Sequence, residues 1–77
     1  MSRERGDLMA IRMRQERAGA RLSQAKLAQI LEVSRATIVN WESGKAEIPG
    51  SAINKMCDLF SCSSDWLLGR TEARNVS

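Results

Sequence analysis

The residues whose chemistry is most informative lie close together in one short segment, which reads Arg35-Ala36-Thr37 and continues to Asn40. An arginine guanidinium donates two hydrogen bonds to the O6 and N7 edge of guanine, and an asparagine amide matches the N6 and N7 edge of adenine. The alanine and the threonine methyl group suit contact with the 5-methyl group of thymine. These residue types predict a helix that reads base edges in the major groove of duplex DNA.

Polar residues beside this segment extend the predicted interface. We expect base-region contacts from Gln24, Ser34, Arg35, Ala36, Thr37 and Asn40, and phosphate contacts from Ser43 and Lys45. Side chains of this kind, together with backbone N–H groups at a helix N-terminus, commonly hold phosphates. Four of these residues also have a simpler role that involves no DNA. Gln24 could cap its own helix, Lys45 could be a solvated loop residue, and Arg35 or Asn40 could lie on a solvated helix face.

Five short helices are expected to position these residues, which makes the fold all-α. The strongest signals are helix-capping serines at Ser23, Ser34, Ser51 and Ser63, since a serine side chain satisfies a free N–H group of the first turn. Asp7 is the expected cap of the first helix, whose apolar residues form two stripes and leave its buried face open. The expected helices are 8–20, 24–31, 35–43, one beginning after Ser51 that carries the apolar pattern of 53–60, and a short one at 64–68.

A turn of about three residues between the second and third helices indicates a helix-turn-helix. Its expected inward residues are Leu27, Ala28, Leu31, Val33, Ile38 and Trp41. A small residue at position 28 allows the two helices to cross closely. The other face of the third helix, which carries the predicted base-reading residues, is expected to point outward.

Length and charge indicate one small domain with a polyanionic partner. The chain has 77 residues and a net charge of +3. Residues 1–45 carry nine Lys and Arg against five Asp and Glu, whereas residues 46–77 carry three against four. The basic part therefore coincides with the predicted reading element. We expect a core at about 8–69, a polar start at 1–7 and a loose tail at 70–77.

Several other functions find little support. The chain has no histidine, so an enzyme is not expected, and its two cysteines, Cys57 and Cys62, are expected to pack in the core without metal. Arg12, Arg14 and Arg21 are expected to form a solvated face. We expect no cofactor, membrane partner or small-molecule ligand, and a cytoplasmic protein, since no apolar run is long enough for a signal or a membrane span.

A resemblance to a known family rests on motifs spread over most of the chain. These are Arg17, Leu-Ser-Gln at 22–24, Leu-Ala at 27–28, Val-Ser-Arg at 33–35, Trp-Glu-Ser-Gly-Lys at 41–45, Pro49 and Asp-Trp-Leu-Leu-Gly at 65–69. With this spacing the chain resembles the Cro/phage-repressor, or XRE-type, helix-turn-helix family. The resemblance implies a five-helix lambda-repressor-like domain that binds a palindromic operator as a homodimer and regulates transcription in a bacterium or its phage.

The resemblance also implies roles for particular residues. Arg17 and Glu42 correspond to a structural ion pair that ties the first helix to the third. Trp66, Leu67 and Leu68, with the neighbouring fourth helix, correspond to the dimer contact. Whether the chain is a Cro-like protein, a stand-alone regulator or a separate DNA-binding domain stays open, as does a second function: a protein-interaction module such as an antitoxin or an antagonist.

Four residues depart from the family pattern. Glu32 and Arg21 stand where glycine is usual, Glu16 replaces an apolar residue, and Lys26 replaces a frequent glutamate. A positive φ is uncommon for residues other than Gly, Asn and Asp. Glu32 is therefore expected either to be strained or to belong to a turn of different construction.

Overall fold

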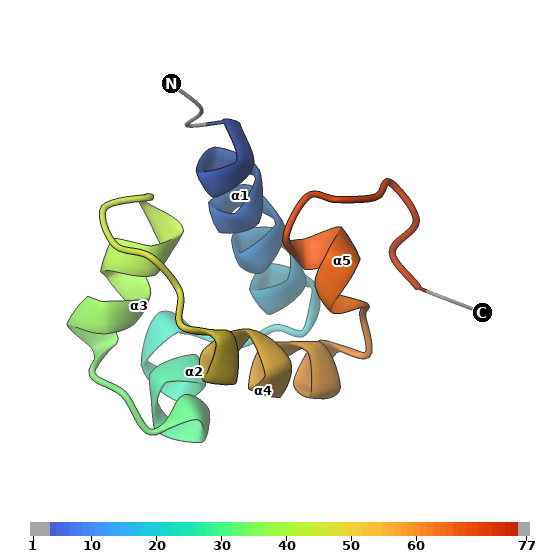
Figure 1. Ribbon diagram of the computed structural model, residues 1–77. Coiled ribbons are helices and arrows are strands. Elements are labelled where there is room, and N and C mark those ends of the chain that lie inside the picture. Colours follow the sequence, from blue (N-terminus) through green and yellow to red (C-terminus); the bar gives the residue numbers. More distant parts are fainter. Residues whose placement is uncertain (1–3, 76–77) are drawn as a thin grey trace.

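The computed structural model describes residues 4–75, which form five helices in chain order (Figure 1). These are α1 (Glu4–Gly19), α2 (Gln24–Leu31), α3 (Arg35–Glu42), α4 (Gly50–Phe60) and α5 (Ser64–Leu67). No strand occurs within this part of the chain. The all-α prediction is therefore confirmed, and the second and third helices have the predicted bounds to within one residue.

Three of the predicted serine caps form. The hydroxyl oxygens of Ser23, Ser34 and Ser63 each accept a hydrogen bond from the N–H group three residues ahead, at 3.0–3.1 Å. Each bond satisfies a donor that has no partner within its own helix. Local sequence chemistry therefore sets the beginnings of α2, α3 and α5.

The expected caps of the other two helices are wrong. α1 already begins at Glu4, so Asp7 lies inside it. α4 begins at Gly50 with Pro49 as its N-cap and without a side-chain cap, which places Ser51 in its first turn. The Pro49 carbonyl accepts the Ile53 N–H group at 3.0 Å, so the proline starts the helix through its backbone oxygen.

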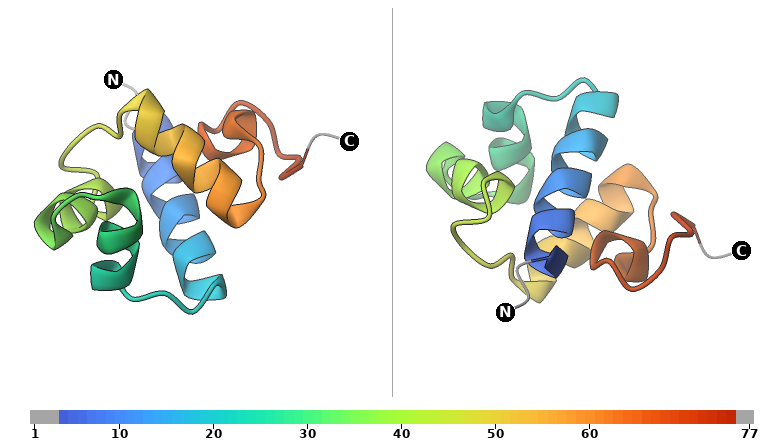
Figure 2. Two further views of the ribbon diagram at one scale, coloured as in Figure 1. Left: turned by 90° about the horizontal axis from the view of Figure 1, so that it is seen from below. Right: turned by 90° about the horizontal axis from the view of Figure 1, so that it is seen from above.

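α1 lies between the α2–α3 pair and the C-terminal elements, as the views from above and below show (Figure 2). It turns its Met9 and Met13 stripe toward the core, which settles the choice that the sequence left open. Met13 is fully buried, whereas Ile11 on the other stripe is 40% exposed. The residues with essentially no exposed surface are Met13, Leu27, Ile38, Met56 and Leu67, contributed by all five helices.

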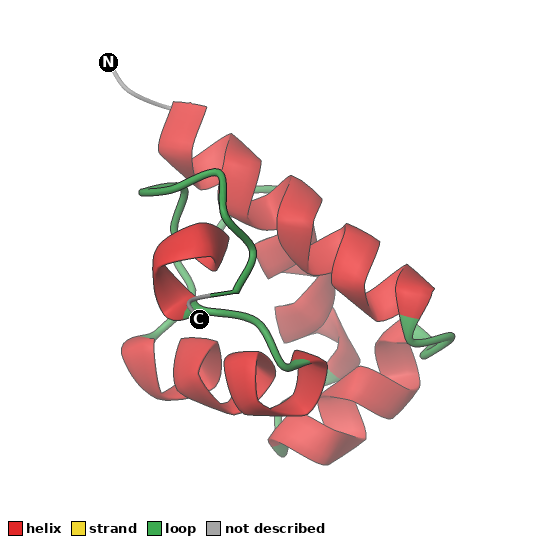
Figure 3. Cartoon of the chain, turned by 90° about the vertical axis from the view of Figure 1, so that its right-hand side faces the viewer, coloured by secondary structure: helices red, strands yellow, loops and turns green. Residues whose placement is uncertain are grey.

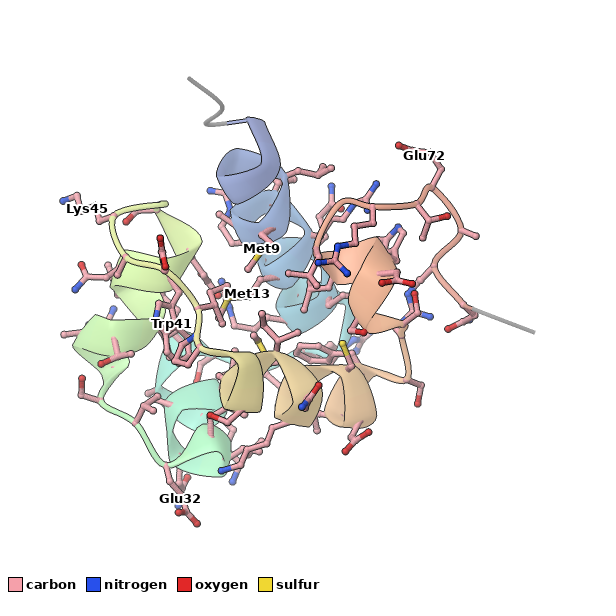
Figure 4. All side chains as sticks on the ribbon, viewed as in Figure 1. Met9, Met13, Glu32, Trp41, Lys45 and Glu72 are labelled. Atoms are coloured by element: carbon pink, nitrogen blue, oxygen red, sulfur yellow. The ribbon has the colours of Figure 1, made fainter. Side chains whose placement is uncertain are left out.

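The turn between α2 and α3 contains a left-handed residue. Glu32 has φ 60° and ψ 44°, and its N–H group donates to the Gln29 carbonyl while that of Val33 donates to the Ala28 carbonyl. Arg21 also has a positive φ of 60°. Both residues therefore adopt a conformation that favours glycine, at a typical cost of about 1–3 kcal/mol each. Glu32 lies at the tip of this turn (Figure 4).

The segment that follows α5 belongs to the predicted loose tail at 70–77, whose last two residues lie outside the described part of the chain. Residues 70–75, here called the strap, fold back beside α5 and α1 (Figure 3). Arg74 holds the strap in place: it contacts both carboxylate oxygens of Glu16, at 2.6 and 2.8 Å, and the carbonyl of Phe60 at 2.6 Å. Contact with Glu16 raises the pKa of Arg74. Glu16, unusual at its position, thereby has a partner.

Arg12 is the second anchor of the strap, and its predicted place on a solvated face is wrong. It is 6% exposed and donates to the carbonyls of Trp66 and Thr71. Its guanidinium lies 4.6 Å from the centre of the Trp66 ring, and that of Arg74 lies 5.8 Å from the same centre. The two arginines therefore hold the indole by cation–π contact and connect it to the strap.

Replacing Arg74 with Met is expected to destabilise the fold by about 1–3 kcal/mol, because Glu16 and the Phe60 carbonyl lose their donor. Urea denaturation measures this loss. Arg70→Met is the matched control, since Arg70 pairs with Asp65 at 3.6 Å while both side chains are more than half exposed. Equal stabilities of the two variants would show that the strap contributes little to folding.

Candidate nucleic-acid interface

The two faces of α3 differ sharply in exposure. Ile38, Trp41 and Glu42 are buried against α1 and α2. Of the predicted base-reading residues on this helix, Ser34, Arg35, Ala36 and Asn40 are exposed and Thr37 is partly exposed. The exposure of these side chains therefore agrees with the prediction that α3 presents them outward. Their contact with DNA remains a proposal.

A buried ion pair fixes α3 on α1. The Arg17 Nε atom donates to Glu42 Oε2 at 2.6 Å, and Nη2 donates to Glu42 Oε1 at 3.1 Å. The third guanidinium nitrogen donates to the Leu22 carbonyl at 2.8 Å. The Glu42 side chain is only 3% exposed and that of Arg17 is 19% exposed. The pair implied by the family resemblance is thus present and shielded from water.

This pair is connected to the outward face through Gln24. The Gln24 amide nitrogen donates to Glu42 Oε1 at 3.1 Å, and its amide oxygen accepts from Arg35 Nη2 at 3.3 Å. Gln24 therefore donates a hydrogen bond to the buried Glu42 carboxylate and, through its amide oxygen, orients the exposed Arg35 guanidinium. This arrangement places Arg35 beside the N-terminus of α2.

The hydroxyl groups of this face have structural partners within the protein. Ser34 Oγ lies 2.9 Å from Thr37 Oγ1 in addition to capping α3. Ser43 Oγ donates to the Asn40 carbonyl at 3.2 Å, at the end of the helix. Each hydroxyl keeps free lone pairs, and the Asn40 side chain itself is exposed. Both serines therefore stabilise the ends of α3, and a contact with nucleic acid would be an additional role.

The loop after α3 brings a lysine to the same side. Gly44 has φ 79°, and the next N–H group, that of Lys45, donates to the Asn40 carbonyl at 2.9 Å. The Lys45 side chain is exposed and points away from the body of the protein (Figure 4). It lies on the opposite side from Glu72 of the strap, so Lys45 and the strap face different directions.

The region predicted to form the dimer contact is only partly available. Leu67 is fully buried in the chain's own core, so it offers no surface to a partner. The Trp66 ring is held by Arg12 and Arg74 and is half-buried. Leu68 is half-buried and lines a pocket of about 310 Å³. The other lining residues are Met9, Trp41, Ile48, Ile53 and the loop 44–47.

The two cysteines are buried in the core, as predicted, and they lie close to each other. Both are free and 9% exposed, and burial raises the pKa of the Cys57 thiol to about 12 and also raises the pKa of Cys62. Thiols with raised pKa values carry little reactive thiolate at neutral pH. Within residues 4–75 no cluster of three or more His, Cys, Asp or Glu side chains is placed to hold a metal ion. None of the described helices is long and apolar enough to cross a membrane.

Sequence reasoning missed two kinds of residue. Arg12 and Glu16 share the face of Met9 and Met13 at helical spacing, and this periodicity was the available signal that they are not solvated. Val39 was not considered for the interface, yet it is 37% exposed on the outer side of α3. An apolar residue at an outward helical position was the signal there.

Comparisons with known proteins agree with this geometry. A family model described as helix-turn-helix matches residues 13–67, whereas a comparison with curated proteins finds no match. The P22 c2 repressor protein, solved in complex with a synthetic operator, has a TM-score of 0.74 and 30% identity, over 82% of this chain and 96% of that one.

Two further solved structures are similar. The DNA-binding domain of the P22 c2 repressor in solution has a TM-score of 0.73 and 32% identity, over 82% of this chain and 83% of that one. A hypothetical transcription factor from Neisseria has a TM-score of 0.76 and 25% identity, over 87% of this chain and 76% of that one. The chain therefore belongs to the Cro/phage-repressor (XRE-type) helix-turn-helix family and has its five-helix lambda-repressor-like fold.

Proposed function

We propose that the protein is a sequence-specific DNA-binding regulator of transcription, a repressor that binds a two-fold symmetric operator as a homodimer. The observation that carries the proposal is the outward face of α3, where Arg35, Ala36 and Asn40 are exposed while the opposite face is buried. The similarity to a repressor solved with its operator supports the same reading. In this proposal the outward face of α3 enters the major groove.

Each polar residue of the interface has a proposed task. Arg35 pairs with a guanine and Asn40 with an adenine, while Ala36 and the Thr37 methyl group contact thymine. Gln24, held between Glu42 and Arg35, orients Arg35 and contacts the adjacent base region or backbone. Ser43 and Lys45 hold phosphates, and Ser34 contacts the base region next to its cap.

A dimer is proposed because one small domain buries only about 600–1,000 Å² on DNA, which seldom provides biological specificity. Two copies would place their α3 helices about 34 Å apart, one helical turn of DNA. Trp66 and Leu68 remain the proposed contact residues, without the buried Leu67. Sedimentation of the protein on DNA tests this: two copies on a symmetric site are expected, and a monomer on an asymmetric site would contradict it.

Selection of bound duplexes from a random pool tests the function itself. We expect an inverted repeat whose half-site contains a guanine and an adenine at fixed positions. Recovery of no bound duplex would contradict DNA regulation and favour a protein-interaction module of the same fold. Strong binding without preference would instead indicate non-specific nucleic-acid binding, which a net charge of only +3 disfavours.

Alanine variants of Arg35 and Lys45 should separate base reading from phosphate holding. Arg35→Ala is expected to weaken operator binding by about 1–3 kcal/mol and to relax preference at one base pair of each half-site. Lys45→Ala should weaken binding to all sequences alike and reduce the salt slope by about one unit. Titrations of operator and scrambled duplexes at several salt concentrations measure both. An unchanged base preference in Arg35→Ala would show that α3 is not the reading helix.

A further inference from the structure

Four large apolar side chains are exposed on the described surface, and one of them lies inside the proposed interface. Ile11, Ile30 and Leu59 are 39–40% exposed on α1, α2 and α4, while Val39 is 37% exposed on α3. A single exposed apolar residue is common and needs no function. The place of Val39 on its helix is what distinguishes it from the other three.

Val39 shares one face of α3 with the residues proposed to read bases. Helical geometry puts it one turn after Arg35 and Ala36 and one turn before Ser43, since residues three and four apart are neighbours on a helix surface. Arg35, Ala36 and Ser43 are all exposed. Ser43 is turned back onto the Asn40 carbonyl at 3.2 Å, and Arg35 is drawn toward Gln24 at 3.3 Å. The two methyl groups of Val39 therefore lie at the surface between two polar residues that have other partners.

The chemistry of the major groove leaves one suitable partner for such a group. Valine has no hydrogen-bonding atoms, and covering a base N–H or carbonyl group with it would remove that group from water without compensation. The 5-methyl group of thymine is the apolar feature that a base pair presents in the major groove. The side chain is also stiff, because branching at Cβ leaves one strongly preferred rotamer in a helix.

We propose that Val39 is a specificity-determining residue that packs on the 5-methyl group of a thymine in each half-site. Four residues of helix span about 6 Å, which corresponds to about two base-pair steps. The thymine is therefore expected about two base pairs from the guanine contacted by Arg35. This inference rests on the proposed function and adds to it a base that the polar residues do not read.

Replacing thymine with uracil tests the contact, because uracil lacks the methyl group and keeps every hydrogen-bonding group. In each test duplex, one thymine position of the selected half-site is replaced, and the replacement is made in both half-sites of the operator. At the position packed by Val39, the replacement is expected to weaken binding of the wild-type protein by about fourfold per half-site, the value of one methyl group removed from water. Val39→Ala should bind the thymine and uracil forms of that position equally well. Thymines contacted by Ala36 and the Thr37 methyl group should also respond, equally in wild type and in Val39→Ala.

Leu59→Ala is the matched control, since Leu59 is similarly exposed but lies on α4. It should keep the full wild-type response to uracil. Because Val39 is exposed, its alanine variant is expected to fold, which thermal denaturation verifies before binding is measured. If wild type and Val39→Ala respond alike to uracil at every position while binding stays selective, the inference about Val39 is overturned and the proposed function stands. If the random pool yields no preferred duplex, both are overturned.

Discussion

Replacing Arg17 with Met is expected to destabilise the protein by about 3–5 kcal/mol, because it leaves the buried Glu42 carboxylate without its cation. Glu42 would keep only the hydrogen bond from Gln24, and the Leu22 carbonyl would lose its donor. For a domain of this size the loss corresponds to roughly 4–8 °C in Tm per kcal/mol. Thermal denaturation followed by circular dichroism measures it.

Two comparisons decide whether the buried charge is the cause. Arg14→Met alters an exposed arginine of the same helix and should change stability by less than about 0.5 kcal/mol. Removing both charges, with Arg17→Met and Glu42→Leu together, should recover much of the loss, since no unpaired charge remains inside. The folded fraction of Arg17→Met should keep the wild-type base preference. A small loss of stability joined to altered base preference would instead assign Arg17 to the DNA interface.

The second large effect is expected at Ile38, where substitution by Ala should cost about 2–5 kcal/mol. Ile38 has no exposed surface and lies in the core cluster with Leu27 and Trp41. Truncation removes apolar contacts and leaves a cavity that the short helices around it fill only in part. Equilibrium urea denaturation at constant temperature measures the change.

The adjacent residue provides the control for Ile38. Val39→Ala alters an exposed side chain on the other side of α3 and should change stability by less than about 0.5 kcal/mol. The Ile38 variant should therefore lose stability, whereas the Val39 variant should keep its stability and change its base preference. A comparable loss of stability in both variants would mean that α3 is rotated about its axis relative to this structure.

Most features that depend on neighbouring residues are predicted from the sequence, although the expected caps at Asp7 and Ser51 are wrong. The caps at Ser23, Ser34 and Ser63 need only an N–H group three residues ahead, and each forms as expected. The buried face of α3 follows from apolar spacing within one helix. The Arg17–Glu42 pair joins distant residues, and it was implied by the family pattern and not by the local sequence.

Features that depend on distant parts of the chain were missed for a physical reason. Arg12 is covered by Trp66 and by Thr71 of the strap, and Glu16 is partly covered by Arg74 of the strap. Nothing near position 74 signals that the strap returns to α1, since the partner of Arg74 there, Glu16, lies 58 residues away. Glu32 adopts a left-handed conformation because the packing of α2 on α3 requires it, although its residue type disfavours it.

Contacts between protein protons and base protons would show whether the outer face of α3 reads duplex DNA. Isotope-filtered NMR on labelled protein bound to the selected unlabelled duplex detects such contacts without interference from the dimer interface. We expect nuclear Overhauser effects from the methyl groups of Ala36 and Val39 to major-groove protons, thymine methyl groups included. Effects to major-groove protons arising from α1, α4 or α5, with none from α3, would contradict a role of α3 in reading DNA.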